Sequence, residues 1–65
     1  MPAEDEGVII EMIGMGRYVK VSAVDVRTGT EVSIVGDPRR GEAALRQTAI
    51  RKLRYVMNRP ERESG

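Results

Sequence analysis

Cysteine, histidine, phenylalanine and tryptophan are all absent from this 65-residue chain. Without cysteine there is no disulfide and no thiolate ligand for a metal, and without histidine the commonest general base and metal ligand is missing. We therefore expect no metal site and no cofactor. The only candidates for acid–base chemistry would be Asp25, Glu31, Glu11, Lys20 and Tyr18, on an open sheet without a predicted cleft, so we expect no catalytic residues and no enzyme.

The chain also lacks a long hydrophobic segment. No stretch approaches the roughly 20 apolar residues that span a membrane, and the acidic first six residues do not resemble a signal peptide. These features predict a soluble cytoplasmic protein. Its length is near the lower limit for a domain held by a hydrophobic core alone, so association with itself or with a partner would add useful stability.

The best-defined element of the sequence is a β-hairpin. Two alternating segments, Tyr18–Asp25 and Thr30–Val35, flank a turn that contains Gly29, and glycine adopts the positive φ that such a turn requires. The Asp25 carboxylate can accept hydrogen bonds from turn amides. Pairing Asp25 with Thr30 then places three pairs opposite each other: Ala23 and Val32, Val21 and Ile34, Ser22 and Ser33. Turn chemistry and hydrophobic pattern therefore agree on one register.

A first strand and a helix complete the predicted domain. Val8–Ile13 alternates like the hairpin arms, and a turn within Gly14–Gly16 leads into the hairpin. Beyond Asp37, a good N-cap, apolar residues recur every three or four positions from Glu42 and indicate an amphipathic helix that ends near Asn58, before Pro60. The predicted fold is α+β: a three-stranded antiparallel meander with one C-terminal helix packed on one face (β-β-β-α).

This single β3α domain is predicted to span residues 7–58, between a disordered acidic tail at 1–6 and a polar C-terminal tail at 59–65. Its core is predicted to join one sheet face to the apolar stripe of the helix. The predicted members are Val8, Ile10, Met12, Val19, Val21, Ala23, Val32 and Ile34 of the sheet and Leu45, Ala49, Ile50, Leu53, Val56 and Met57 of the helix.

Three segments resemble a family of small alphaproteobacterial proteins of unknown function: Tyr18–Asp25, Thr28–Val35 and Arg51–Val56. The resemblance implies that residues 8–58 form one self-contained unit. It implies no activity, because no function or catalytic residue is established for that family.

Apolar residues on the sheet face that the helix leaves uncovered offer one functional interpretation. Scattered exposed apolar side chains are normal, whereas several that form a contiguous patch on a small sheet indicate a protein partner or a homodimer. We expect protein–protein association or self-association through this outer face, by a non-catalytic interaction module. The predicted contact residues are Ile9, Ile13, Tyr18, Val24 and Val35.

The alternative interpretation is nucleic-acid binding through a basic helix. Residues 1–38 carry three basic and seven acidic side chains, whereas residues 39–65 carry eight basic and three acidic ones. On the exposed side of the helix, phosphates would be contacted by Arg51, Lys52, Arg54 and Arg59. A solvated face whose late positive charges complement the helix dipole explains the same pattern. Only Tyr18 could stack bases on the sheet, and Tyr55 is expected to be half-buried beside the core stripe.

Overall fold

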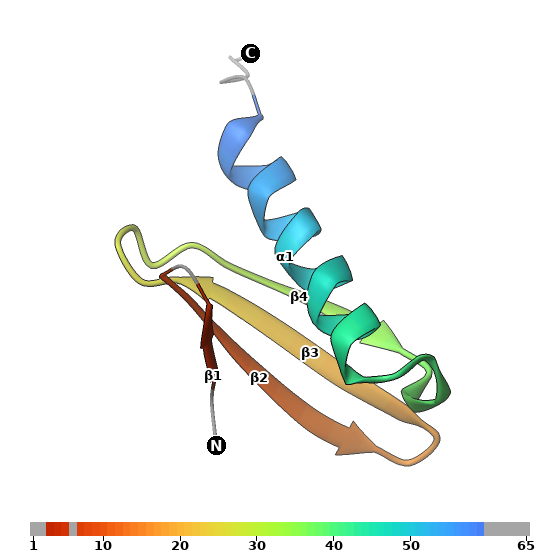
Figure 1. Cartoon of the computed structure of the whole chain (residues 1–65). Helices are drawn as coiled ribbons and strands as arrows, with labels where there is room; N and C mark the ends of the chain where they lie inside the picture. Colours follow the sequence, from red (N-terminus) through yellow and green to blue (C-terminus); the bar gives the residue numbers. More distant parts are fainter. Residues whose placement is uncertain (1–2, 6, 60–65) are drawn as a thin grey trace.

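A computed structural model describes residues 3–5 and 7–59 of the chain. Its strands form one antiparallel sheet in chain order, and a helix lies across one face of that sheet (Figure 1). The β-β-β-α architecture is therefore confirmed. The elements are β1 (Ala3–Asp5), β2 (Val8–Met15), β3 (Tyr18–Asp25), β4 (Glu31–Gly36), the short 3-10 helix η1 (Pro38–Arg40) and α1 (Glu42–Asn58).

The N-terminal segment differs from the prediction. Residues 1–6 were expected to be disordered, but Ala3–Asp5 form the short strand β1, which pairs with β2 so that Glu4 lies opposite Ile9. Without β1, strand β2 would be an edge with unpaired backbone groups, and an extended segment can satisfy these groups whatever its side chains are. The sheet therefore has a fourth, short strand. Residues 1, 2 and 6, and residues 60–65 of the predicted polar tail, lie outside the described residues.

The β3–β4 hairpin has the predicted register. Ala23 pairs with Val32, Val21 with Ile34 and Ser22 with Ser33. The turn closes through the Asp25 amide, which donates to the Thr30 carbonyl at 2.8 Å, while Gly29 has a φ of 77°. The Asp25 carboxylate accepts hydrogen bonds from the hydroxyl and the amide of Thr28, at 2.8 and 2.9 Å, and these bonds lower the pKa of Asp25.

The β2–β3 turn lies further along the chain than predicted. Met15 pairs with Tyr18, so Gly16 and Arg17 form a two-residue turn in which Gly16 has a φ of 63°. The prediction of a turn within Gly14–Gly16 was wrong because Gly14 continues the strand. Met12 pairs with Val21, so Met12 keeps the face predicted for it, but Met15 now belongs to the strand.

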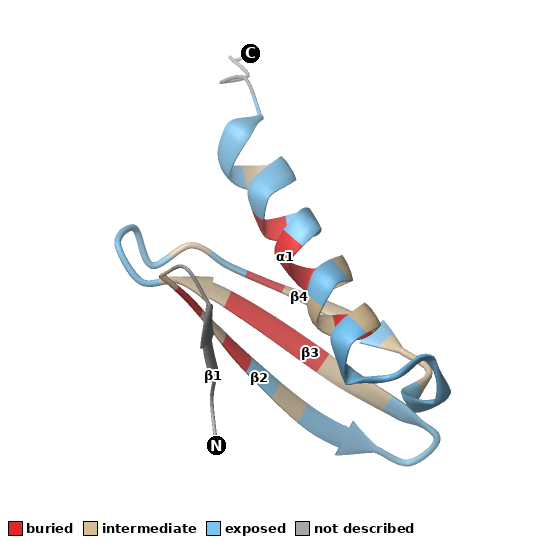
Figure 2. Cartoon of the chain, in the orientation of Figure 1, coloured by how far each residue is buried: buried red, intermediate tan, exposed pale blue. Residues whose placement is uncertain are grey.

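The core lies between one face of the sheet and α1. In Figure 2 the buried residues gather along the middle of the strands and the side of α1 that faces them. Half-buried side chains border the core: Met12, Val19, Ile34 and Val56. The buried apolar residues are Val8, Ile10, Val21, Ala23, Val32, Leu45, Ala49, Ile50 and Leu53.

Met57, which was predicted to join the core, is 39% exposed. It borders a hollow of about 210 Å³ with Val8, Asp25 and Leu53, where the last turn of α1 stands off the sheet. The end of α1 extends past the strands in Figure 1, so an apolar residue in its last turn has little to pack against. Helical periodicity alone could not reveal this limit.

The ends of α1 match the sequence signals. The Asp37 carboxylate accepts a hydrogen bond from the Arg39 amide at 2.9 Å and caps η1, and α1 begins directly after Gly41. Its last residue is Asn58, because Arg59 is extended (φ −65°, ψ 138°) before Pro60, as predicted.

Candidate functional site

The strand register determines which residues lie together on the outer face of the sheet, the face opposite α1. Residues that pair across antiparallel strands share a face. The four rows on this face are Ile9–Val24–Glu31, Glu11–Ser22–Ser33, Ile13–Lys20–Val35 and Met15–Tyr18.

The five apolar residues predicted to contact a partner all lie on this face, but they do not form one patch. Ile9 and Val24 are half-buried at one end. The other three are exposed and lie beyond a polar row in which the hydroxyls of Ser22 and Ser33 are 3.2 Å apart. The structure thus separates Ile9 and Val24 from Ile13, Tyr18 and Val35.

The exposed group gains one residue that the sequence interpretation missed. Met15 is 52% exposed, next to Ile13 (48%), Tyr18 (57%) and Val35 (63%). We call these four residues the outer patch. The outer patch lies toward the β2–β3 turn, where Figure 2 shows the strands exposed. A sequence interpretation with the two-residue turn at Gly16 and Arg17 would have predicted that Met15 lies opposite Tyr18.

Charged residues lie within and beside the outer patch. Lys20 is half-buried and pairs with Ile13 on one side and Val35 on the other. Its alkyl stem can therefore cover apolar neighbours while its ammonium group stays in water. Glu11 is exposed two positions before Ile13 in the same strand, so the outer face carries charges of both signs.

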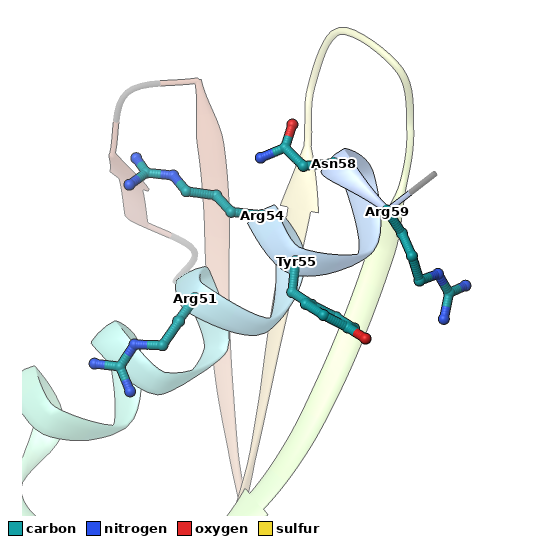
Figure 3. Close-up of a pocket in the computed structure, with 5 residues that line it drawn as sticks. All are labelled: Arg51, Arg54, Tyr55, Asn58 and Arg59. Atoms are coloured by element: carbon teal, nitrogen blue, oxygen red, sulfur yellow. The ribbon is translucent and has the colours of Figure 1, made fainter. Parts of the chain in front are cut away.

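A second candidate surface lies on the exposed side of α1. A hollow of about 390 Å³ is lined there by Arg51, Arg54, Tyr55, Asn58 and Arg59, which we call the helix hollow (Figure 3). All five side chains are exposed, and among the residues that the structure describes no carboxylate lines the hollow. Three of the four arginine and lysine residues predicted for nucleic-acid binding therefore lie together.

Tyr55 is the residue of the helix hollow that the sequence interpretation misplaced. It was expected to be half-buried but is 66% exposed. Tyr55 follows Arg51 by four residues, about one helical turn, and so shares its face rather than that of the core stripe. In Figure 3 Arg51 and Arg54 extend to one side of α1 and Tyr55 and Arg59 to the other.

Lys52 does not join the helix hollow. Its ammonium group donates a hydrogen bond to the backbone carbonyl of Ser33 at 2.9 Å. Ser33 lies in β4, which ends the strand order and is therefore an edge of the sheet. Lys52 therefore supplies a donor to a backbone carbonyl of this edge strand.

A family model described as "Domain of unknown function (DUF6898)" matches residues 5–60. The chain belongs to this family. The match covers β2, β3, β4 and α1 completely, and with them both surfaces described above. Neither a curated protein nor a solved structure matches the chain.

Two other polar side chains of this DUF6898 member, Asp25 and Asp37, make contacts that stabilise the fold. Asp25 is held by Thr28, and Asp37 forms an ion pair with Arg39 at 2.7 Å. The Arg39 side chain, followed by its amide, lowers the pKa of Asp37. Glu11, Glu31 and Tyr18 are exposed on the outer face, where Lys20 is half-buried.

Two further features of the DUF6898 domain bear on its chemistry. Within residues 3–5 and 7–59, no three or more acidic side chains lie close enough together to hold a metal ion. In the same part of the chain, no helix is both long and apolar enough to cross a membrane.

Proposed function

We propose that this DUF6898 member is a non-catalytic interaction module that associates with a second copy of itself through the outer patch. The observation that carries the proposal is the exposure of four large apolar side chains on one end of the outer face: Ile13, Met15, Tyr18 and Val35. Small soluble domains seldom leave such a group exposed without a partner. We also propose an alphaproteobacterial origin, which the sequence resemblance supports, and a cytoplasmic location, which the sequence composition supports.

A second copy suits this surface because the surface is self-complementary. A two-fold interface brings each residue against a different residue of the same patch. Stacking two outer faces about a two-fold axis would bury the outer patch and bring Lys20 of each copy toward Glu11 of the other. Both charges then have partners across the interface, where such pairs favour a particular orientation.

Sedimentation equilibrium over a concentration series tests the proposal. We expect the natural chain to dimerise as its concentration rises and Val35→Glu to remain monomeric, because a carboxylate in the interface is costly to desolvate. Val26→Glu is the matched control, since Val26 is similarly exposed (47%) but lies beyond the other end of β3. A natural chain that stays monomeric at high concentration overturns the proposal, as does a Val35→Glu variant that still dimerises.

The orientation has its own test. Lys20→Glu should weaken the dimer, because the new carboxylate would face Glu11 of the other copy. Adding Glu11→Lys should restore the dimer, because the charge pair is then reversed rather than lost. If the double variant is no stronger than Lys20→Glu alone, the two residues do not meet across the interface.

A second candidate function, nucleic-acid binding, is favoured by a separate observation. The helix hollow gathers Arg51, Arg54 and Arg59, and none of the described residues that line it is a carboxylate. Arginine contacts phosphate through paired hydrogen bonds, and cationic grooves attract nucleic acid. Lys52, which is bound to Ser33, is not needed for this contact.

The test of this candidate is titration of labelled DNA and RNA at low salt. Arg51→Glu should abolish most of the affinity without unfolding the domain, because Arg51 is exposed. Arg27→Glu, which makes the same charge change in the β3–β4 turn, should retain most of it. Affinity that does not depend on salt, or that falls equally in both variants, contradicts binding at the helix hollow.

A further inference from the structure

We infer that the helix hollow takes single-stranded rather than duplex nucleic acid, with a base stacked on Tyr55 and neighbouring phosphates held by Arg51 and Arg59. The inference rests on the nucleic-acid candidate above and specifies its ligand. It differs from the sequence interpretation, in which Tyr18 on the sheet was the only stacking residue.

The chain contains two aromatic side chains, Tyr18 and Tyr55. Tyr18 borders a hollow of about 460 Å³ that is also lined by Arg17, Arg39 and the Asp37 carboxylate, and Arg39 is already paired with Asp37, which leaves one net positive charge there. Within residues 3–5 and 7–59, arginine and asparagine line the hollow beside Tyr55, and no carboxylate does. A phosphate is therefore attracted more strongly near Tyr55 than near Tyr18.

The spacing along α1 suits a single strand. Arg51 and Tyr55 are four helical residues apart, about 6 Å along the helix axis, and Arg59 follows Tyr55 by four residues, just after the helix ends. Single-strand sites combine cationic side chains that follow the backbone with aromatic rings on which bases stack.

A duplex would use less of this surface. Its bases are stacked on one another and paired, so the exposed ring of Tyr55 would have no base to receive. The side-chain amide of Asn58, also in the helix hollow, offers both a donor and an acceptor to the edge of an unpaired base. The arginines would attract a single strand and a duplex alike through their charge, whereas stacking on Tyr55 favours the single strand.

Tyrosine fluorescence reads this contact directly, because the chain has no tryptophan. Tyr18→Phe leaves Tyr55 as the sole fluorophore, and we expect its emission to be quenched when oligo(dT) or oligo(U) is added at low salt. Tyr55→Phe leaves Tyr18, and we expect oligomer binding without quenching, with binding followed by the anisotropy of a labelled oligomer. Quenching of Tyr18 instead of Tyr55 overturns the inference.

Affinity gives the second readout. Tyr55→Ala should weaken single-strand binding on the order of tenfold, while Tyr55→Phe and the matched control Tyr18→Ala should leave it nearly unchanged. If the three arginines of the helix hollow each contact a phosphate, the slope of log K against log salt should be about −2, and Arg51→Ala should reduce its magnitude by about 0.7.

The outcomes separate this inference from the function on which it rests. Equal affinity for a duplex of matched length, with Tyr55→Ala unaffected and Arg51→Glu inactive, overturns the single-strand inference but leaves nucleic-acid binding in place. No binding of any oligomer at low salt removes both. A helix hollow that binds an acidic peptide but no oligomer also overturns both, because its ligand is then a protein.

Discussion

The outer patch and the helix hollow are two exposed surfaces of opposite character on one small domain. The outer patch is apolar and comes from strand residues that face away from α1. The helix hollow is cationic and comes from consecutive turns of α1 that face away from the sheet. Each surface is the side of its element that the shared core does not use. A two-layer domain of this size therefore exposes one face of each layer, and sequence composition decides what each face can bind.

Breaking the shared core should remove both surfaces at once, which is the largest effect we expect. Leu53 is fully buried between α1 and the sheet, so Leu53→Ala should cost about 2–5 kcal/mol of unfolding free energy. That is a large part of the roughly 3–10 kcal/mol typical of a domain of this length. Urea denaturation followed by circular dichroism measures the loss. Gln47→Ala, an exposed change in the same helix, should stay within about 0.5 kcal/mol.

A smaller change at the contact between the two layers tests how closely they pack. A Cβ at Gly36 would lie 2.5 Å from a terminal methyl carbon of Leu45, which is buried. Gly36→Ala should therefore destabilise the domain by about 1–3 kcal/mol, because Leu45 must move within a filled core. The Gly36→Ala, Leu45→Ala double variant should lose less than the sum of the two single variants. Strict additivity would show that Leu45 is not the residue displaced.

Changes confined to one surface should separate the two functions with little effect on stability. Val35→Glu should weaken self-association and leave oligonucleotide binding intact, and Arg51→Glu should do the reverse. Both residues are exposed, so we expect each to change the unfolding free energy by about 0.5 kcal/mol or less. Sedimentation and anisotropy on the same samples measure the two activities. Loss of both activities in either variant would mean that the surfaces are coupled.

Acid should have the smallest effect, and it should act on the turns rather than on either surface. The pKa values of Asp25 and Asp37 are lowered from 3.8, by hydrogen bonds from Thr28 and Arg39 respectively. A lowered pKa in the folded state means that the carboxylate contributes stability above the unfolded value and loses it as pH falls through the folded value. The urea midpoint should therefore fall modestly below about pH 4, since both carboxylates are partly open to solvent.

Variants at the β3–β4 turn show how much of this acid dependence comes from Asp25. Asp25→Asn should remove the part that belongs to Asp25, and Thr28→Val should reduce it, because the hydroxyl donor is lost while the amide remains. An unchanged pH profile in Asp25→Asn would exclude the turn as its source.

What could be predicted from the sequence was local. The register of β3 and β4 followed from Gly29, Asp25 and the alternation of the two arms, all within 20 residues of one another. The end of α1 followed from Pro60, whose ring excludes helical geometry at Arg59. The exposure of Arg51 and Arg54 followed from helical periodicity.

Tertiary structure decided which of these residues meet. It added β1 through backbone pairing that has no side-chain signature, and it left Met57 39% exposed beside a hollow at the end of α1. It brought Lys52 to the Ser33 carbonyl, 19 residues earlier in the chain, and thereby removed Lys52 from the predicted basic cluster. Periodicity tells which side of a strand or helix is apolar. Where α1 lies on the sheet depends on the packing of side chains such as Leu45 and Leu53 against strands distant in sequence, and that packing sets the limits of both surfaces.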